Sequence, residues 1–304
     1  MCCLFGIYNY SGTEIKGLAK VTNSLAREAT VRGTDATGIA YNHKGSLVTH
    51  KEPKSAYDIT FIHPENVMAI MGHTRHTTQG NEKHNFNNHP FPGSCKNLRF
   101  ALAHNGILMN DKSLRQKLKL PRTKIETDSY VAVQILERQK QLNDESIKYM
   151  AEKVEGSFSF TILDSNDTLR FVKGDSPLSI IHFPEQKVYV YASTDEILYK
   201  ALIGTDFFKA IKNAEFEEIN IDEGQRLNIS TDGTIATSKF NYTNTYCGDY
   251  CWWRYGRNIF SKGTYIDELK SVAKSCGYDP DTIDDLLNSG FTPDEIEEYI
   301  YCCE

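Results

Sequence analysis

Long apolar runs are missing from this chain of 304 residues. The best candidate, Val67–Met71, is far shorter than the roughly 20 residues that a membrane-spanning helix requires. The opening residues carry no basic flank ahead of an apolar stretch, which a secretory signal would have. No segment of about 20–50 residues repeats, so the pattern of a solenoid is also absent. We therefore predict a globular cytoplasmic protein.

A large excess of positive charge is absent too. The chain contains 34 Lys and Arg residues against 40 Asp and Glu residues, which gives a net charge of −6. This balance argues against a nucleic-acid-binding platform. We predict no nucleic-acid partner, no membrane contact and no bound cofactor.

Disulfides are not needed, although eight cysteines are present. A chain of this length can bury its own core, so we expect reduced thiols. Cys247 and Cys251 have a loose metal-ligand spacing, but no second pair lies near them. A second possible metal site would use histidines of one polar loop, namely His73, His76, His84 and His89. We adopt neither alternative and predict no metal.

The hydrophobic pattern predicts both strands and helices. Leu4–Tyr10 has the pattern of a buried strand, and Glu14–Ala29 that of an amphipathic helix. After Gly156, short β-rich stretches follow one another in hairpins, a helix is predicted over Asp195–Leu202, and late strands are predicted at Phe216–Ile221 and Gln225–Ile229. About ten strands are expected in all. Because strands and helices do not alternate strictly, we predict an α+β fold of antiparallel sheets with helices packed outside.

The amino-acid composition of the sequence changes near Phe240. We expect a main domain over residues 2–240, a linker or packing strap over 241–263, and a small helical extension over 264–304. Three helices are predicted in the extension, at Tyr265–Cys276, Pro280–Asn288 and Thr292–Cys302. Their apolar faces either pack on the main domain, which we favour, or dock a partner.

The most informative residue for chemistry is Cys2. Removal of Met1 would place a thiol and a free α-amine on this one residue. The α-amine has an ordinary pKa of about 7.7–8.0, so it can accept and return a proton near neutral pH. This is the logic of an N-terminal nucleophile, which needs no separate histidine as base. Cys3 is interpreted as a packed thiol.

Four further residues could complete a site, although each has a plainer explanation. Asn105 followed by Gly106 could form a tight turn whose amide donors hold an oxyanion, or could be an ordinary turn. Arg75 suits bidentate binding of a carboxylate, or could be a surface arginine. Asp128 could bind an ammonium group, or could cap a helix predicted over 128–141.

Several short motifs, taken together, resemble a known family. They occur in order as Cys2-x-Leu4-Phe5-Gly6-Ile7, Arg32-Gly33-x-Asp35-x-x-Gly38, Gly72-His73-Thr74-Arg75-x-x-Thr78-x-Gly80, Asn88-His89-Pro90, His104-Asn105-Gly106-Ile107, Thr127-Asp128, Gly174-Asp175-Ser176-Pro177-Leu178 and Ala192-Ser193-Thr194-Asp195. This set resembles the class II glutamine amidotransferase domain, an N-terminal-nucleophile hydrolase, over roughly residues 2 to 240.

The resemblance implies a four-layer αββα sandwich of two antiparallel sheets. It also implies that Cys2 attacks the side-chain amide of glutamine to give a γ-glutamyl thioester and ammonia, and that water then releases glutamate. Asn105 and the Gly106 amide would hold the oxyanion. Glutamine, or an amide like it, would be the substrate.

The resemblance further implies how the amino-acid end of the substrate is held. Arg75 would bind the α-carboxylate, with Thr78 nearby, and Asp128 would bind the α-ammonium group. Arg32 and Asp35 would support the region around the N-terminus.

The chain also departs from the family pattern. His76 and Thr77 stand where the aminotransferase members carry Trp and Ala, in a loop that often closes over bound glutamine. The last sixty or so residues contain no recognisable phosphate loop or nucleotide site. We therefore expect a stand-alone glutaminase, which could pass ammonia to a separate synthase subunit. The alternatives are a related amide or γ-glutamyl hydrolase and a non-catalytic binding protein.

Overall fold

The computed structural model describes residues 2–96, 98–211, 214–242, 266, 269–270, 273, 278–293 and 295–296. The chain divides into two compact units, Met1–Thr243 and Asn244–Glu304. Within the described residues, no helix has the length and apolar character needed to cross a membrane.

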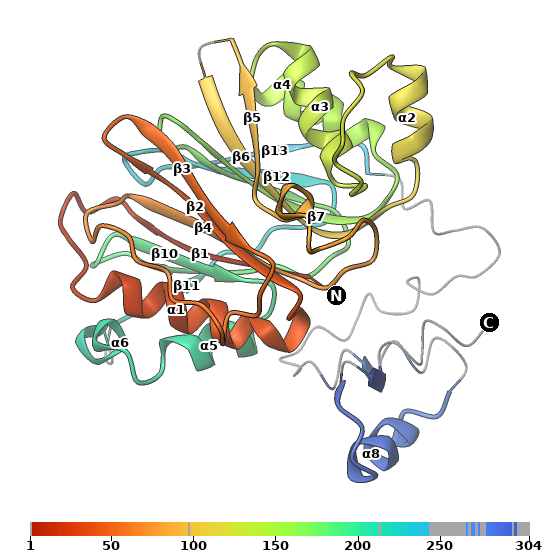
Figure 1. Cartoon of the computed structure of the whole chain (residues 1–304). Helices are drawn as coiled ribbons and strands as arrows, with labels where there is room; N and C mark the ends of the chain where they lie inside the picture. Colours follow the sequence, from red (N-terminus) through yellow and green to blue (C-terminus); the bar gives the residue numbers. More distant parts are fainter. Residues whose placement is uncertain are drawn as a thin grey trace. The chain divides into compact units, whose positions relative to one another are not determined.

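The first unit contains two antiparallel sheets (Figure 1). Sheet A has the spatial order β11 (Glu217–Glu218), β9 (Ser179–Phe183), β10 (Val188–Ala192), β1 (Cys3–Asn9), β4 (Ala69–Arg75), β2 (Ala36–His43), β3 (Ser46–Glu52). Sheet B has the order β13 (Ile235–Lys239), β12 (Gln225–Ile229), β8 (Leu169–Lys173), β7 (Gly156–Asp164), β6 (Leu98–Leu108), β5 (Phe91–Cys95).

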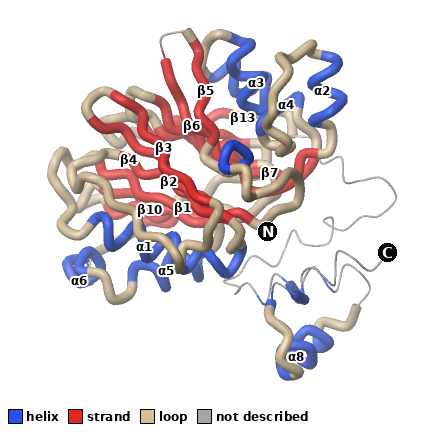
Figure 2. The backbone as a smooth tube through the Cα atoms, in the orientation of Figure 1, coloured by secondary structure: helices blue, strands red, loops and turns tan. Residues whose placement is uncertain are grey.

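Helices cover the outer face of each sheet, and the sheets pack on each other (Figure 2). Sheet A carries α1 (Leu18–Glu28), α5 (Asp195–Leu202) and α6 (Asp206–Ile211), and sheet B carries α2 (Asp111–Lys117), α3 (Tyr130–Gln139) and α4 (Asp144–Lys153). Two short 3₁₀ segments, η1 (Ala29–Arg32) and η2 (Asn85–Asn87), lie in the connections. The predicted four-layer αββα sandwich is confirmed.

Strand β1 explains why the sequence begins with a continuous apolar run. Its residues alternate between two cores: Phe5 packs under α1 and α5, whereas Leu4 and Tyr8 pack between the sheets. All seven residues are buried, because the strand lies at the centre of sheet A between β10 and β4. A strand buried on both faces has no polar alternation.

Some predicted boundaries were wrong for local reasons. Helix α1 begins at Leu18 rather than Glu14, because Gly17 before it adopts a left-handed conformation with φ 76°. The strand predicted over Phe216–Ile221 contains only Glu217 and Glu218. Strand β13 was not predicted, since its side chains are mostly exposed and show no apolar alternation.

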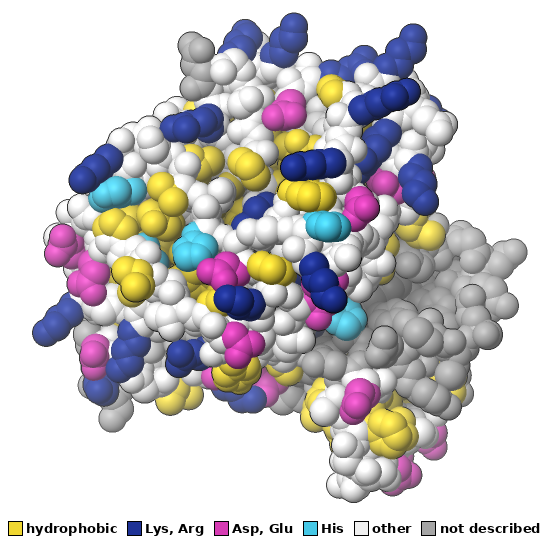
Figure 3. All heavy atoms as spheres, in the orientation of Figure 1, with side chains coloured by type: hydrophobic (Ala, Val, Ile, Leu, Met, Phe, Trp, Pro, Cys, Tyr) yellow, Lys and Arg dark blue, Asp and Glu magenta, His cyan; other side chains and the backbone are white. Residues whose placement is uncertain are grey.

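The second unit is described only in part. Helix α8 spans Asp281–Asn288, as predicted, and follows Pro280. Lys270 forms an ion pair with Asp284 at 2.7 Å. Most of the chain beyond Tyr242 lies outside the described residues. This part includes the predicted strap, Cys247, Cys251 and most of the other two predicted helices. Figure 3 shows acidic and basic side chains interspersed over the visible face of the described residues.

Candidate active site

The Cys2 thiol lies just before the central strand of sheet A. Its Sγ donates a hydrogen bond to the His76 carbonyl at 3.4 Å, and Arg32 Nε donates to the Cys2 carbonyl at 3.1 Å. Burial raises the pKa of the Cys2 thiol, although the His76 hydrogen bond and the charge of Arg75 oppose this. A thiol with a raised pKa needs a base to become a nucleophile.

The neighbouring Cys3 thiol points the other way. Cys3 is fully buried, belongs to the core beneath α1 and α5, and donates from Sγ to the Leu4 carbonyl at 3.3 Å. The Cys2 thiol instead contacts the His76 carbonyl. The structure therefore supports a packed role for Cys3.

Asn105 and Gly106 are positioned by strand pairing. Both lie inside β6, opposite Ser159 and Phe158 of β7, so the predicted tight turn at Asn105-Gly106 was wrong. Gly106 has φ 130°, and a Cβ there would lie 2.1 Å from the Ser157 carbonyl oxygen. An Asn-Gly pair favours a turn locally, but here pairing with a strand distant in the sequence determines the backbone conformation.

Ser193 connects this strand to the thiol strand. Its Oγ accepts a hydrogen bond from the Leu4 amide at 2.9 Å and another from Asn105 Nδ2 at 3.4 Å. The side-chain amide of Asn105 is thereby held within reach of the start of β1. The sequence placed Ser193 in a family motif but gave it no role; the hydrogen bonds reveal one.

Arg75 is 2% exposed at the end of β4. Its Nη2 donates to the carbonyls of Gln79 and Gly80 at 2.6 and 3.2 Å, and its Nη1 donates to Asn88 Oδ1 at 2.6 Å. Burial lowers the pKa of Arg75. Since both Nη2 hydrogens are engaged, a ligand carboxylate must use the remaining donors or displace the loop carbonyls. Arg75 is not the surface arginine of the plainer interpretation.

The loop after Arg75 is fixed from the other side by Asp35. The Asp35 carboxylate accepts a hydrogen bond from the Thr77 amide at 2.6 Å, and the Asp35 amide donates to the Arg75 carbonyl at 2.9 Å. Thr78, one residue further on, is exposed. Asp35 thus contacts the loop rather than Cys2 itself.

Asp128 does not cap a helix. Helix α3 begins at Tyr130, and its N-cap residue Ser129 makes no side-chain capping bond. Instead, Asp128 Oδ2 accepts a hydrogen bond from the Leu108 amide at 2.6 Å. The carboxylate therefore pins the end of β6, two residues beyond Gly106. Asp128 is 3% exposed, and its charge acts to raise the pKa values of both Cys2 and Arg75.

Known proteins share sequence similarity with this chain. Residues 73–200 match the family model described as "Glutamine amidotransferase domain". The glutamine–fructose-6-phosphate aminotransferase (isomerizing) of Listeria innocua is 31% identical over 182 residues, which is 58% of this chain and 28% of that protein. The aminotransferase of the same name from Halalkalibacterium halodurans is 29% identical over 251 residues, 78% of this chain and 39% of that protein. Residues 73–200 are therefore similar in sequence to a glutamine amidotransferase domain.

The fold of the first unit has solved counterparts. The glutamine phosphoribosylpyrophosphate amidotransferase from B. subtilis superposes with a TM-score of 0.62 at 24% identity, covering 80% of this chain and 50% of that one. This likeness concerns the fold. In each of these comparisons the chain spans half or less of the relative's length. The match therefore says nothing about the activities of the rest of those proteins.

Three buried histidines connect the two sheets near the candidate site. His73 Nε2 lies 2.9 Å from the His104 carbonyl, and the rings of His73 and His89 are 4.1 Å apart. Burial lowers all three pKa values, that of His73 to about 3. Among the described residues, no group of three or more His, Cys, Asp or Glu could hold a metal.

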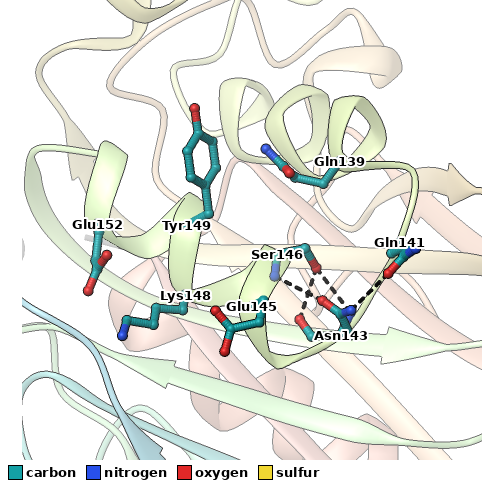
Figure 4. Close-up of a pocket in the computed structure, with 8 residues that line it drawn as sticks. All are labelled: Gln139, Gln141, Asn143, Glu145, Ser146, Lys148, Tyr149 and Glu152. Carbon is teal, nitrogen blue, oxygen red and sulfur yellow. Dashed lines mark hydrogen bonds between the residues drawn. The ribbon is translucent and has the colours of Figure 1, made fainter.

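A separate surface pocket lies outside this site (Figure 4). It is lined by residues of α4, of the end of α3 and of the segment between them, and has a volume of about 360 Å³. Asn143 and Ser146, which cap α4 by reciprocal hydrogen bonds, are among the lining residues. Because α4 covers the outer face of sheet B, this pocket is not part of the site around Cys2.

Proposed function

We propose that this chain hydrolyses the side-chain amide of glutamine to glutamate and ammonia. Removal of Met1 frees the α-amine of Cys2, which takes the thiol proton as Sγ attacks the amide carbon. The proton passes to the leaving nitrogen, ammonia departs, and a γ-glutamyl thioester remains. Water activated by the same amine then cleaves the thioester, releases glutamate and restores the thiol.

The proposal rests mainly on the link between the thiol strand and Asn105. Ser193 Oγ accepts hydrogen bonds from the Asn105 side-chain amide and from the backbone amide of Leu4, two residues after Cys2. In this arrangement Asn105 Nδ2 and the Gly106 amide would donate to the oxyanion of the tetrahedral intermediate. Arg32, hydrogen bonded to the Cys2 carbonyl, would keep the freed chain end in place.

Recognition of the amino-acid end would fall to the residues on the other side of the thiol. Arg75 would bind the α-carboxylate with Thr78 beside it, and Asp128 would bind the α-ammonium group. A reducing compartment, the cytoplasm, would keep Cys2 as a thiol. A separate synthase subunit that accepts ammonia is the partner this chemistry would serve.

The proposal is tested by glutamate release from glutamine with the protein whose Met1 removal has been checked by intact mass. Wild type should turn over glutamine and Cys2→Ala should not. Cys3→Ala is the matched control, since it removes the neighbouring thiol and should retain activity. Equal turnover in wild type and Cys2→Ala would reject the assignment.

A further inference from the structure

Besides Asp35, Glu126 also holds the loop that follows Arg75. Glu126 Oε2 accepts hydrogen bonds from the Asn81 amide at 3.2 Å and from Asn87 Nδ2 at 2.8 Å. The Glu126 carbonyl accepts from Gln79 Nε2 at 2.9 Å, and the Glu126 amide donates to Asn87 Oδ1 at 2.9 Å. Four hydrogen bonds therefore attach both ends of one loop to one residue about forty positions away.

The same loop supplies the groups that hold Arg75. The carbonyls of Gln79 and Gly80 accept from Nη2, and Asn88 accepts from Nη1. Gly80, at φ 79°, is so close to Glu126 that a Cβ on it would lie 3.0 Å from the Cβ of Glu126. The loop that Glu126 contacts is therefore the same loop that hydrogen bonds to the guanidinium.

The other side of Glu126 leads directly to Asp128. The intervening Thr127 donates from Oγ1 to the Asn87 carbonyl at 3.3 Å, and Asp128 holds the Leu108 amide. Residues 126–128 thus contact the loop at one end and strand β6 at the other. The two charged groups assigned to the amino-acid end of the substrate are joined through this segment.

We propose that Glu126 is a positioning residue that couples Arg75 to Asp128 by latching the loop over residues 79–88. The inference rests on the proposed function, because it takes the ligand to be a free α-amino acid with two charged ends. Asn105 is held by strand pairing, and the Cys2 thiol contacts His76 rather than residues 79–88, so neither residue contacts the latch. Loss of Glu126 therefore weakens substrate recognition and leaves the chemical step intact.

The exposure of Glu126 makes the latch reversible. The side chain is exposed, so water competes for its hydrogen bonds and the loop can open at modest cost. A substrate that engages both Arg75 and Asp128 favours the latched form. An amide without an α-carboxylate cannot gain from the latch, because it makes no contact that the loop prepares.

The test compares Glu126→Ala and Glu126→Gln with Glu185→Ala. Glu185 is an exposed glutamate in the turn between β9 and β10, at the end of β1 away from Cys2, which makes it a matched control. Steady-state kinetics are measured with glutamine and with 4-aminobutanamide, which is glutamine without its carboxylate. Hydrogen exchange over residues 77–88 is measured in parallel.

We expect Glu126→Ala to raise KM for glutamine about tenfold, with kcat within about twofold of wild type. KM for 4-aminobutanamide should hardly change, so discrimination between the two amides should fall about tenfold. Glu126→Gln keeps one acceptor oxygen and should give an intermediate KM. Exchange over 77–88 should be faster in Glu126→Ala and unchanged in Glu185→Ala.

An unchanged KM for glutamine in Glu126→Ala, or equal KM increases for both amides, would overturn the coupling. Unchanged exchange would overturn the latch itself. Failure of the proposed function has a different signature: wild type and the Glu185→Ala control would both lack turnover, while faster exchange in Glu126→Ala would still support the latch.

Discussion

The two halves of the proposed site are held in different ways. Asn105 and Gly106 lie within β6 and are paired residue by residue with β7. Arg75 ends a strand, but its guanidinium is oriented by a loop that side-chain hydrogen bonds hold in place. A backbone ladder fixes atoms regardless of most side-chain changes, whereas a loop held by side chains can be retuned by single substitutions. The reaction and the recognition of substrate should therefore be separable by mutation.

The strand-built half should be the more damaging to alter, and Gly106→Ala is the extreme case. Gly106 has φ 130°, and the new Cβ would lie 2.1 Å from the Ser157 carbonyl oxygen. Relieving this contact requires a shift of the backbone, which costs considerable free energy. We expect the free energy of unfolding to fall by about 3 kcal/mol or more, with loss of turnover. Urea unfolding measures the first effect and glutamate release the second.

Gly12→Ala is the control for Gly106→Ala. Gly12 also has a positive φ, 73°, but a Cβ there meets nothing within 4 Å. Gly12→Ala should lower the free energy of unfolding by only about 1 kcal/mol, which is the strain of the backbone conformation. Equal destabilisation by the two substitutions would show that the strand at Gly106 is not rigid.

Asn105→Ala tests the chemical contribution of the same half. Removing one oxyanion donor typically lowers kcat about 10²–10³-fold. We expect that loss here, with KM within about threefold of wild type, because Asn105 is not assigned to the amino-acid end of the substrate. Steady-state kinetics decide the point. A variant whose KM rises while its kcat is preserved would reverse the assignment of the two halves.

Arg75→Lys tests the loop-built half. Lysine carries the charge but cannot satisfy Gln79, Gly80 and Asn88 in the planar geometry of arginine. We expect KM for glutamine to rise about 10–100-fold with kcat changed only a few-fold, since charge-assisted hydrogen bonds contribute about 1.5–3 kcal/mol. A fall in kcat at unchanged KM would contradict a recognition role.

The buried histidines connect the halves and should make the domain sensitive to acid. Burial keeps His89 neutral in the folded state, and its two ring nitrogens have no hydrogen-bond partner among the described residues. The unfolded chain binds a proton near pH 6.5, whereas the folded chain does so only at a much lower pH. Below about pH 6.5 the unfolded state therefore binds more protons than the folded state, and the free energy of unfolding falls as the pH falls.

His89→Phe should reduce this acid sensitivity while keeping an aromatic ring in place. Each histidine that stays neutral contributes a slope of about 1.4 kcal/mol per pH unit below its unfolded pKa. The difference in unfolding free energy between pH 7 and pH 5 should therefore be about 2 kcal/mol smaller in the variant than in wild type. Urea titrations at both pH values measure it; identical slopes would contradict a neutral buried His89.

The sequence predicted the parts of the fold that depend on local pattern. The apolar run at Leu4–Tyr10 indicated a buried strand, and the helix over Asp195–Leu202 was predicted with its observed boundaries. Asn105-Gly106 was misjudged, because an Asn-Gly pair favours a turn unless a distant strand pairs with it. Pairing with β7 is a property of the whole chain and leaves no local signal.

The candidate site divides in the same way. Cys2, Asn105, Arg75 and Asp128 could be named from motifs, and the structure brings them to one end of the sandwich. Ser193 and Glu126 could not be assigned roles, since their hydrogen bonds join segments far apart in sequence. Long-range side-chain contacts of this kind follow from the assembled fold.

The most direct test of the central claim is to locate the reactive thiol. A labelled diazo-ketone analogue of glutamine is added to the active protein, and the modified peptide is identified by mass spectrometry. The account predicts one adduct, on a Cys2 that begins the polypeptide, with Cys3 unmodified. An adduct on another residue, or turnover by protein that still carries Met1, would contradict it.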